Sequence, residues 1–124
     1  MIDKHALFCN NKHHKMERFL EMCLLLLLFE KPGYGYGLIE QLEYFGFLQE
    51  ELNVGSLYRV LRKMENEKLV ISDWEKSAQG PRRRTYEITN TGKKELDQWI
   101  IILKTRVSRI EKFIERYDND LKKG

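Results

Sequence analysis

Eight consecutive apolar residues, Met22–Phe29, constrain the fold more than any other stretch of this sequence. A bilayer-spanning helix needs roughly 20 apolar residues, so the run is too short to cross a membrane and we expect no membrane partner. Because it is apolar on every side, it predicts a helix over residues 16–30 that is buried all round. Pro32 and Gly33 then end that helix. With 124 residues, the chain is expected to form one domain around it.

The rest of the chain alternates between helical and strand-like patterns. We predict a short helix over residues 38–47 and another over 54–67, with Asn53 as the N-cap of the second. Residues 69–74 and 83–89 have strand composition and flank a Gly-Pro turn, which predicts a β-hairpin. Helical periodicity returns from Thr91 to about Tyr117. The expected fold class is mainly α with a small β-hairpin: a winged helix-turn-helix plus a long C-terminal dimerisation helix.

This order predicts four parts: a flexible N-terminal arm (1–15), a winged helix-turn-helix DNA-binding domain (16–89), the dimerisation helix (90–118) and a tail (119–124). The arm contains His5, Cys9, His13 and His14, but it lacks a C-x-x-C or H-x-x-x-H pair, so we expect no metal site. The two cysteines form no disulfide framework and no signal peptide is recognisable. We therefore expect a cytoplasmic protein without cofactors.

The glycines in "GYGYG", residues 33–37, raise the question of a phosphate-binding loop. A dinucleotide fingerprint needs G-x-G-x-x-G after a strand, whereas this spacing is G-x-G-x-G after a helix. A Walker loop would need Gly-Lys-Ser/Thr, which does not occur here. The segment therefore predicts a corner between two helices, whose exposed amides can still meet a DNA phosphate.

Basic residues cluster in two segments of the C-terminal part, where residues 54–124 carry a net charge of +6 against −3 for residues 1–53. The predicted helix 54–67 has one apolar side; the opposite side and its flanks carry Ser56, Tyr58, Arg59, Arg62 and Lys63. A solvated surface helix has the same pattern, but a helix that follows the turn favours recognition of the DNA major groove. Arg82, Arg83 and Arg84 lie beside the hairpin turn and are expected to contact phosphates or the minor groove.

The last helix carries a heptad seam that is sustained for three repeats. Its members are Leu96, Ile100, Leu103, Val107, Ile110, Ile114 and Tyr117. The ~27 residues from Thr91 would span roughly 40 Å, which is longer than the small domain beneath them. Packing within the chain's own core explains the first two turns equally well. Beyond them the seam needs a partner, and a second copy of the chain is the simplest one.

Three segments together resemble the PadR family of bacterial transcriptional regulators: "GYGYGLIEQL", "GSLYRVLRKMENEKLV" and "SDWEKSAQGPRRRTYEITNTGKKEL". The resemblance covers about residues 19–99. It implies a DNA-binding regulator with Ser56, Tyr58 and Arg59 in the recognition helix, Arg82–Arg84 in the wing, and Tyr36 near the DNA backbone. Gly37 departs from the family pattern, in which an acidic residue is common. The single helix after the wing resembles the compact branch of the family.

Three classes of function remain to be compared. The leading interpretation is a homodimeric repressor that binds a palindromic double-stranded DNA operator. The alternative is a sensor whose main site is an aromatic pocket at the dimer interface, where Trp99 would stack on a planar aromatic effector; an interface or core tryptophan explains the same residue. An enzyme is not expected, because no nucleophile–base pair or paired carboxylates stand out.

Overall fold

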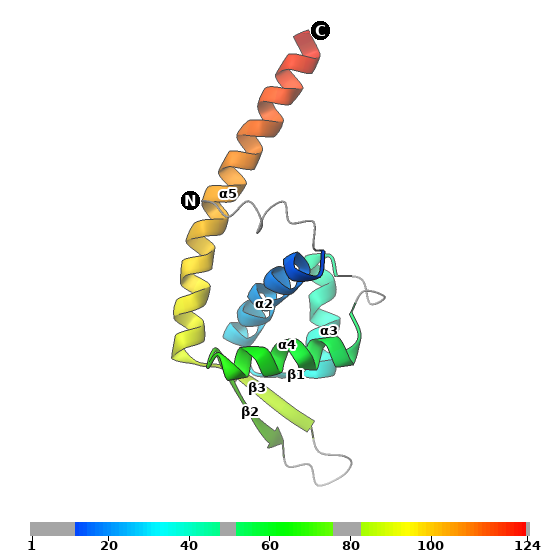
Figure 1. The fold of residues 1–124 in the computed structure, drawn as a ribbon, viewed down its shortest axis with the longest axis vertical. Coiled ribbons are helices and arrows are strands. Elements are labelled where there is room, and N and C mark those ends of the chain that lie inside the picture. Colours follow the sequence, from blue (N-terminus) through cyan, green and yellow to red (C-terminus); the bar gives the residue numbers. More distant parts are fainter. Residues whose placement is uncertain (1–11, 48–51, 76–82, 124) are drawn as a thin grey trace.

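The computed structural model describes residues 12–47, 52–75 and 83–123. Its elements are α2 (Lys12–Glu30), β1 (Gly33–Tyr34), α3 (Gly35–Leu42), the 3-10 turn η1 (Glu43–Phe45), α4 (Val54–Asn66), β2 (Val70–Glu75), β3 (Arg83–Ile88) and α5 (Asn90–Lys123). Figure 1 shows α2 in the middle of the domain, with α3 and α4 beside it and α5 leaving along one edge. The hairpin projects at the end opposite to the free half of α5.

Most of the apolar run of α2 lies in the core, but the prediction that it is buried on every side is wrong at its end, because Phe29 is 54% exposed. Leu24 and Leu25 are almost completely buried, and α2 packs against α3, α4, β3 and α5. The elements α3, α4, β2 and β3 contribute fully buried side chains to the same cluster: Leu38, Leu42, Leu57, Leu61, Met64, Val70 and Tyr86. The core therefore fixes α3 and α4, the two helices of the helix-turn-helix, on the surface of α2.

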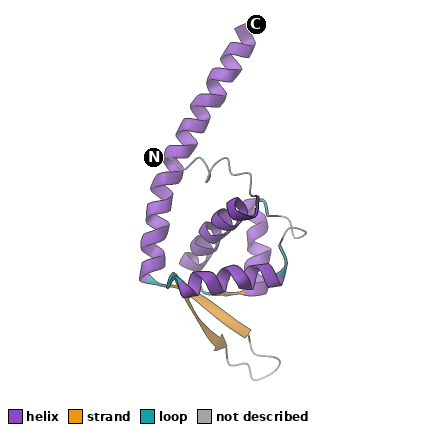
Figure 2. Ribbon diagram, viewed as in Figure 1, coloured by secondary structure: helices purple, strands orange, loops and turns teal. Residues whose placement is uncertain are grey.

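The sheet has three antiparallel strands in the order β1–β3–β2 (Figure 2). The hairpin β2–β3 is where the sequence predicts it, and Trp74 lies opposite Arg84 in its register. Strand β1, in which Gly33 pairs with Tyr86, is not predicted by the sequence. Two residues are too few to show the alternation by which a strand is recognised. The mainly α fold with a small sheet and a long last helix is confirmed.

Several helix boundaries differ from the expectation. Helix α2 begins at Lys12, so residues 12–15 of the predicted arm are helical, while residues 1–11 lie outside the described residues. The predicted helix over residues 38–47 is wrong at both ends, because α3 runs from Gly35 to Leu42 and a 3-10 turn follows it. Two glycines, which are poor helix formers, hide the first turn in the sequence, and Gly46 with its φ of 91° ends the 3-10 turn. Helix α5 continues to Lys123, so residues 119–123 of the predicted tail are helical as well.

Candidate nucleic-acid interface

Helix α4 presents one side to solvent while its apolar side enters the core. Asn53 caps the helix as predicted, because its side-chain Oδ1 accepts a hydrogen bond from the backbone N of Ser56 at 2.7 Å. Leu57 and Leu61 are fully buried, whereas Arg59 and Arg62 are exposed on the other side. This division follows from the 3.6-residue period of the helix. The predicted recognition side is therefore accessible to a ligand.

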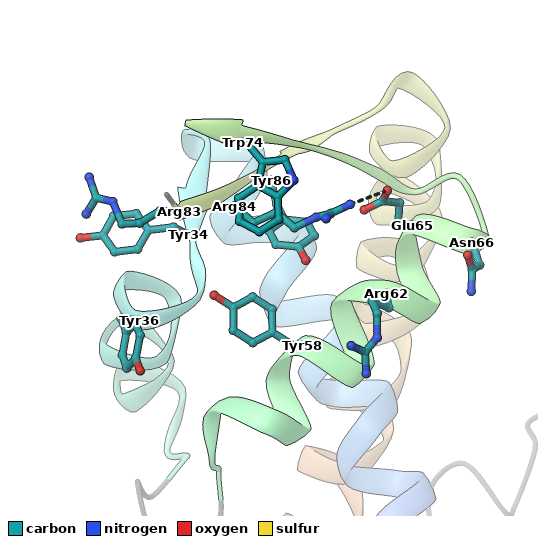
Figure 3. A pocket seen from close by; sticks show the side chains of 10 residues that line it. All are labelled: Tyr34, Tyr36, Tyr58, Arg62, Glu65, Asn66, Trp74, Arg83, Arg84 and Tyr86. Atoms are coloured by element: carbon teal, nitrogen blue, oxygen red, sulfur yellow. Dashed lines mark ion pairs between the residues drawn. The ribbon is translucent and has the colours of Figure 1, made fainter. Parts of the chain in front are cut away.

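An open cavity of about 500 Å³ is lined by side chains of α4, the hairpin, β1 and α3. We call it the wing groove; it is lined by Tyr34, Tyr36, Tyr58, Arg62, Glu65, Asn66, Trp74, Arg83, Arg84 and Tyr86 (Figure 3). Arginine and tyrosine side chains dominate this lining, and both can donate hydrogen bonds to phosphate oxygens. The groove thus brings five of the sequence-predicted DNA-contact residues together: Tyr36, Tyr58, Arg62, Arg83 and Arg84.

Gly35 explains why the start of α3 is rich in glycine. A Cβ atom at this position would lie 2.6 Å from the hydroxyl oxygen of Tyr58, which is closer than real Cβ contacts. The glycine therefore lets the Tyr58 ring of α4 pack against the first turn of α3. Tyr36 follows and is 64% exposed. The glycine segment is a close contact between two helices with an exposed tyrosine at its edge.

The wing arginine Arg83 is held by groups of the sheet itself. Its guanidinium lies 3.2 Å from a carboxylate oxygen of Glu75, the residue opposite it in the hairpin, and 4.2 Å from the centre of the Tyr34 ring. Half of the side chain remains exposed. Arg82, predicted to act with it, lies outside the described residues. Arg83 therefore lines the edge of the groove, and its guanidinium is held there by Glu75 and Tyr34 without being covered.

Arg84 is held more tightly than Arg83, and by a different element. Its Nε donates a hydrogen bond to Ser72 Oγ at 2.8 Å, and its guanidinium lies 5.4 Å from the centre of the Trp74 ring. An Nη of the same side chain lies 3.8 Å from a carboxylate oxygen of Glu65 on α4, the ion pair marked in Figure 3. Arg84 therefore connects the hairpin to the predicted recognition helix.

Lys63 has a different orientation from Arg62, its neighbour on α4. Its ammonium lies 2.9 Å from Glu21 Oε1 on α2, and it lines a separate cavity of about 180 Å³ rather than the wing groove. The helical wheel placed Lys63 on the recognition side because it takes no account of the helix behind α4. The predicted DNA contact of Lys63 stays a prediction, and the structure does not bring it together with the groove residues.

Trp99 lines the same small cavity as Lys63, on the α5 side. It is half-buried, its Nε1 donates to Glu95 Oε1 at 3.2 Å, and the guanidinium groups of Arg18 and Arg106 lie 5.6 and 6.0 Å from its ring centre. Charged groups thus surround the indole on several sides. The stacking of a planar aromatic effector on Trp99 stays a prediction.

The heptad seam of α5 is buried at its start and exposed farther along the helix. Leu96, expected at a dimer interface, is only 7% exposed and belongs to the chain's own core, because α5 packs on α2 over its first turns. Ile100 and Leu103 are partly covered, and the residues beyond them are open: Val107 is 51%, Ile110 42% and Ile114 50% exposed. These three apolar side chains have no cover within the described chain. Their role at a dimer interface stays a prediction.

Burial disfavours ionisation of Cys23 and Tyr86 in the core. Burial raises the pKa of the Cys23 thiol to about 12, and burial also raises the pKa of the Tyr86 phenol, against a smaller lowering effect of Arg84. Among residues 18–121 with described side chains, no three metal-binding side chains cluster. His5 and Cys9, and the side chains of His13 and His14, lie outside that part.

Comparison with known families identifies the chain. A family model described as the transcriptional regulator PadR-like family matches residues 24–98, which is more than half of the sequence. The chain belongs to this family of transcriptional regulators. The PadR resemblance seen in the sequence is thereby confirmed, as is the expectation that the chain is a regulator rather than an enzyme.

Solved structures support the PadR-like fold. A PadR-like transcriptional regulator from Bacillus cereus and a PadR-like transcription factor from Bacteroides fragilis are each 28% identical, each with a TM-score of 0.71, covering 82% of this chain and 96% of theirs. Bacillus subtilis PadR in complex with operator DNA is 22% identical, with a TM-score of 0.59, over 67% of this chain and 47% of that one. No curated protein matches the sequence.

None of the described helices of this PadR-like chain combines the length and apolarity needed to cross a bilayer.

The sequence analysis did not identify Tyr34, Ser72, Glu65 and Trp74, which line the wing groove or contact its arginines. A signal was present for two of them, since Ser72 and Trp74 alternate along β2 on the side of the sheet that also carries Arg84 and Tyr86. Tyr34 and Glu65 depend on how β1 and α4 pack, which no local pattern reports.

Proposed function

We propose that this PadR-like regulator is a homodimeric repressor that binds a palindromic operator. Helix α4 enters the major groove, and the wing contacts the DNA backbone. The wing groove carries this proposal: Arg62 of α4 and Arg83 of β3 line one open cavity beside the exposed side of α4. Arginine on such a helix reads guanine bidentately, whereas arginine on a wing neutralises phosphate.

The solved complex of Bacillus subtilis PadR supports the same use of the fold, because that protein is bound to operator DNA. The second support is the charge distribution, with a net +6 on residues 54–124, which contain α4, the wing and α5. A basic surface next to an exposed helix favours a polyanion partner. Tyr36 and Tyr58 supply hydroxyl groups at the edge of the same groove.

The dimer in this proposal is formed by α5. Its seam residues Val107, Ile110 and Ile114 recur at heptad spacing and are exposed over a length of helix that extends beyond the domain (Figure 1). Because each of these side chains is about half exposed, burying it in a second copy stabilises the pair by roughly 1 kcal/mol. Two domains joined through α5 would present two α4 helices to the two half-sites of an inverted repeat.

Selection of random DNA duplexes with the purified chain tests the proposal. We expect enrichment of an inverted repeat whose half-site centres lie about one DNA turn apart, ~34 Å, or a multiple of it. Affinities for the enriched duplex and a scrambled one are then compared by fluorescence anisotropy. Arg59→Ala/Arg62→Ala should abolish the preference for the enriched duplex.

The matched control is Lys93→Ala/Lys94→Ala, which removes the same charge from exposed positions at the start of α5. It should keep the preference. A chain that enriches no sequence, or a control that loses selectivity as fully as the α4 variant, contradicts the assignment of α4 as the reading helix.

Repression is tested separately with a reporter gene whose promoter overlaps the enriched site. A dimer seated on the promoter excludes the polymerase, so expression of the chain should lower the reporter signal. A higher signal that depends on the intact site would identify an activator instead.

A further inference from the structure

Three polar side chains connect the wing to α4, and we name them the wing brace: Arg84, Ser72 and Glu65. Arg84 Nε donates to Ser72 Oγ at 2.8 Å, and the Ser72 hydroxyl donates onward to Glu65 Oε1 at 2.6 Å. The Arg84 guanidinium also lies 3.8 Å from Glu65 Oε2. Each of the three groups therefore interacts with the other two. Ordered polar networks of this kind polarise one another and hold a single geometry.

The hairpin register explains why this geometry forms. Trp74 is directly opposite Arg84, and Ser72 is directly opposite Tyr86, so all four side chains share one side of the sheet. The Trp74 ring supports the guanidinium at 5.4 Å, and Tyr86 below it is buried in the core (Figure 3). Arg84 is thus fixed by stacking as well as by hydrogen bonding, and only part of its side chain is exposed.

The brace changes the electrostatics of the reading surface. Glu65 is a carboxylate on the predicted recognition helix and lines the wing groove, where it would repel a DNA phosphate. Arg84 compensates that charge, so its own charge is already engaged in the free protein. Arg83 differs, because its carboxylate partner Glu75 belongs to the hairpin and gives no connection to α4. Two adjacent arginines of one strand therefore have different roles.

We propose that Arg84 is a positioning residue: with Ser72 and Glu65 it fixes the angle between the wing and α4, and it thereby sets selectivity for the operator rather than contacting a phosphate. This inference rests on the proposed function. A wing held at one angle lets phosphate contacts and base contacts form together only on DNA of matching shape. Without the brace the wing still binds phosphates, but in several orientations and on any sequence.

Ser72→Ala and Arg84→Lys test the brace in the full-length chain. Ser72→Ala removes the bridging hydroxyl without changing charge. Arg84→Lys keeps the charge but loses the donor fork and the flat stacking surface. For both, we expect the ratio of operator to scrambled-DNA affinity to fall roughly tenfold, a size usual for coupled side chains of one network. The slope of log affinity against log salt should not change, because no phosphate contact is lost.

Thr85→Val is the matched control, because it removes a hydroxyl from the same hairpin on the other side of the sheet. Its selectivity ratio should equal that of the parent. Melting temperature is measured for every variant. A brace variant whose affinities for both duplexes fall together, in step with its melting temperature, has lost stability only and overturns the proposal.

The contact role predicts a different result for Arg84. If Arg84 binds a phosphate, Arg84→Ala weakens binding to every sequence alike and flattens the salt slope by about 0.9, the value for one phosphate. That result overturns the positioning role. Amide hydrogen exchange of residues 70–75 and 83–88 in the absence of DNA supplies a readout independent of the operator. Exchange should accelerate in Ser72→Ala and not in Thr85→Val; equal exchange rates in both overturn the brace even if no operator exists.

Discussion

Gly92 lies in the first turn of α5, where this helix crosses the end of the hairpin. A Cβ atom there would lie 2.2 Å from the backbone oxygen of Leu69 and 2.7 Å from Ile88 Cγ1. The obstructing atom is backbone and cannot rotate away, so Gly92→Ala should lower the free energy of unfolding by about 1–3 kcal/mol. Gly37→Ala is the control, since its nearest atom is 3.6 Å away. It should be neutral or raise the free energy of unfolding by up to about 1 kcal/mol. Urea titrations that show equal effects would contradict the close crossing of α5 and the hairpin.

Arg59 and Arg83 lie on two different elements of the proposed interface, so their alanine variants should lose DNA binding in different ways. Arg59→Ala removes a base-reading side chain, so it should cost about 1–3 kcal/mol on the operator and relax the preference for one base pair. Arg83→Ala should weaken binding to every sequence alike and flatten the salt slope by about 0.9. Anisotropy titrations at several salt concentrations separate the two. An Arg83→Ala variant with the full parental slope would show that Arg83 contacts no phosphate.

Cys23 is predicted to resist alkylation in the folded protein. Burial raises the pKa of its thiol to about 12, so at pH 8 only about one thiol in ten thousand is ionised, and the thiolate is the reactive species. Iodoacetamide should therefore leave Cys23 unmodified until denaturant is added, as peptide mapping by mass spectrometry would show. Rapid labelling at pH 8 without denaturant would mean that α2 is not the buried centre of the core.

Helix α5 should behave as two halves. Its first turns pack on the domain, as Leu96 shows, and its later turns expose an apolar seam. Leu103→Lys/Ile110→Lys places charge in that seam, so it should convert a dimer into monomers or unfold the chain. The control Thr105→Lys/Ser108→Lys adds the same charge to exposed positions on the other side of the helix and should leave the dimer intact. Gel filtration with light scattering reads the mass; unchanged mass in the seam variant would exclude α5 as the interface.

The elements of this fold were largely predictable because their signals are local. Asn53 precedes an apolar period and caps α4, and the two segments of strand composition form β2 and β3. Strand β1 was not predictable, since Gly33 and Tyr34 form it only because β3 lies beside them. The same reason explains why Leu96 lies in the core rather than on an exposed seam, and why Lys63 pairs with Glu21 rather than lining the wing groove. A heptad and a helical wheel give the side of a helix on which a residue lies, but the tertiary fold sets the neighbour on that side.

The residue types at the candidate site were predictable from the sequence, but the partners of each residue were not. Basic residues of α4 and the wing do meet at one groove. The sequence shows Arg82, Arg83 and Arg84 as one basic run, whereas the structure gives Arg83 and Arg84 different partners on different elements. That distinction depends on where Glu65 and Glu75 lie after folding. The positions of basic residues in the sequence therefore indicate which elements form the candidate DNA-binding surface, whereas the packing of those elements determines the partner of each arginine.

At the scale of the whole molecule, the wing and the free half of α5 lie at opposite ends (Figure 1). A dimer formed at the α5 end, as proposed, would leave both wing grooves accessible, so DNA binding and dimerisation would not compete for one surface. Each chain of 14.9 kDa would then contribute one α4 to a shared duplex. In that dimer, the crossing of the two α5 helices would set the spacing of the two α4 helices, which must match about one turn of DNA, ~34 Å.

Sedimentation of the chain with the duplex enriched by selection tests this arrangement most directly. The protein alone, at micromolar concentration, should sediment as a dimer. At saturation, the complex should contain two chains for each full inverted repeat. A duplex cut to a single half-site should bind far more weakly, because only one α4 can engage it. A monomer in the absence of DNA together with one chain per full repeat would contradict the proposed dimeric mode of operator binding.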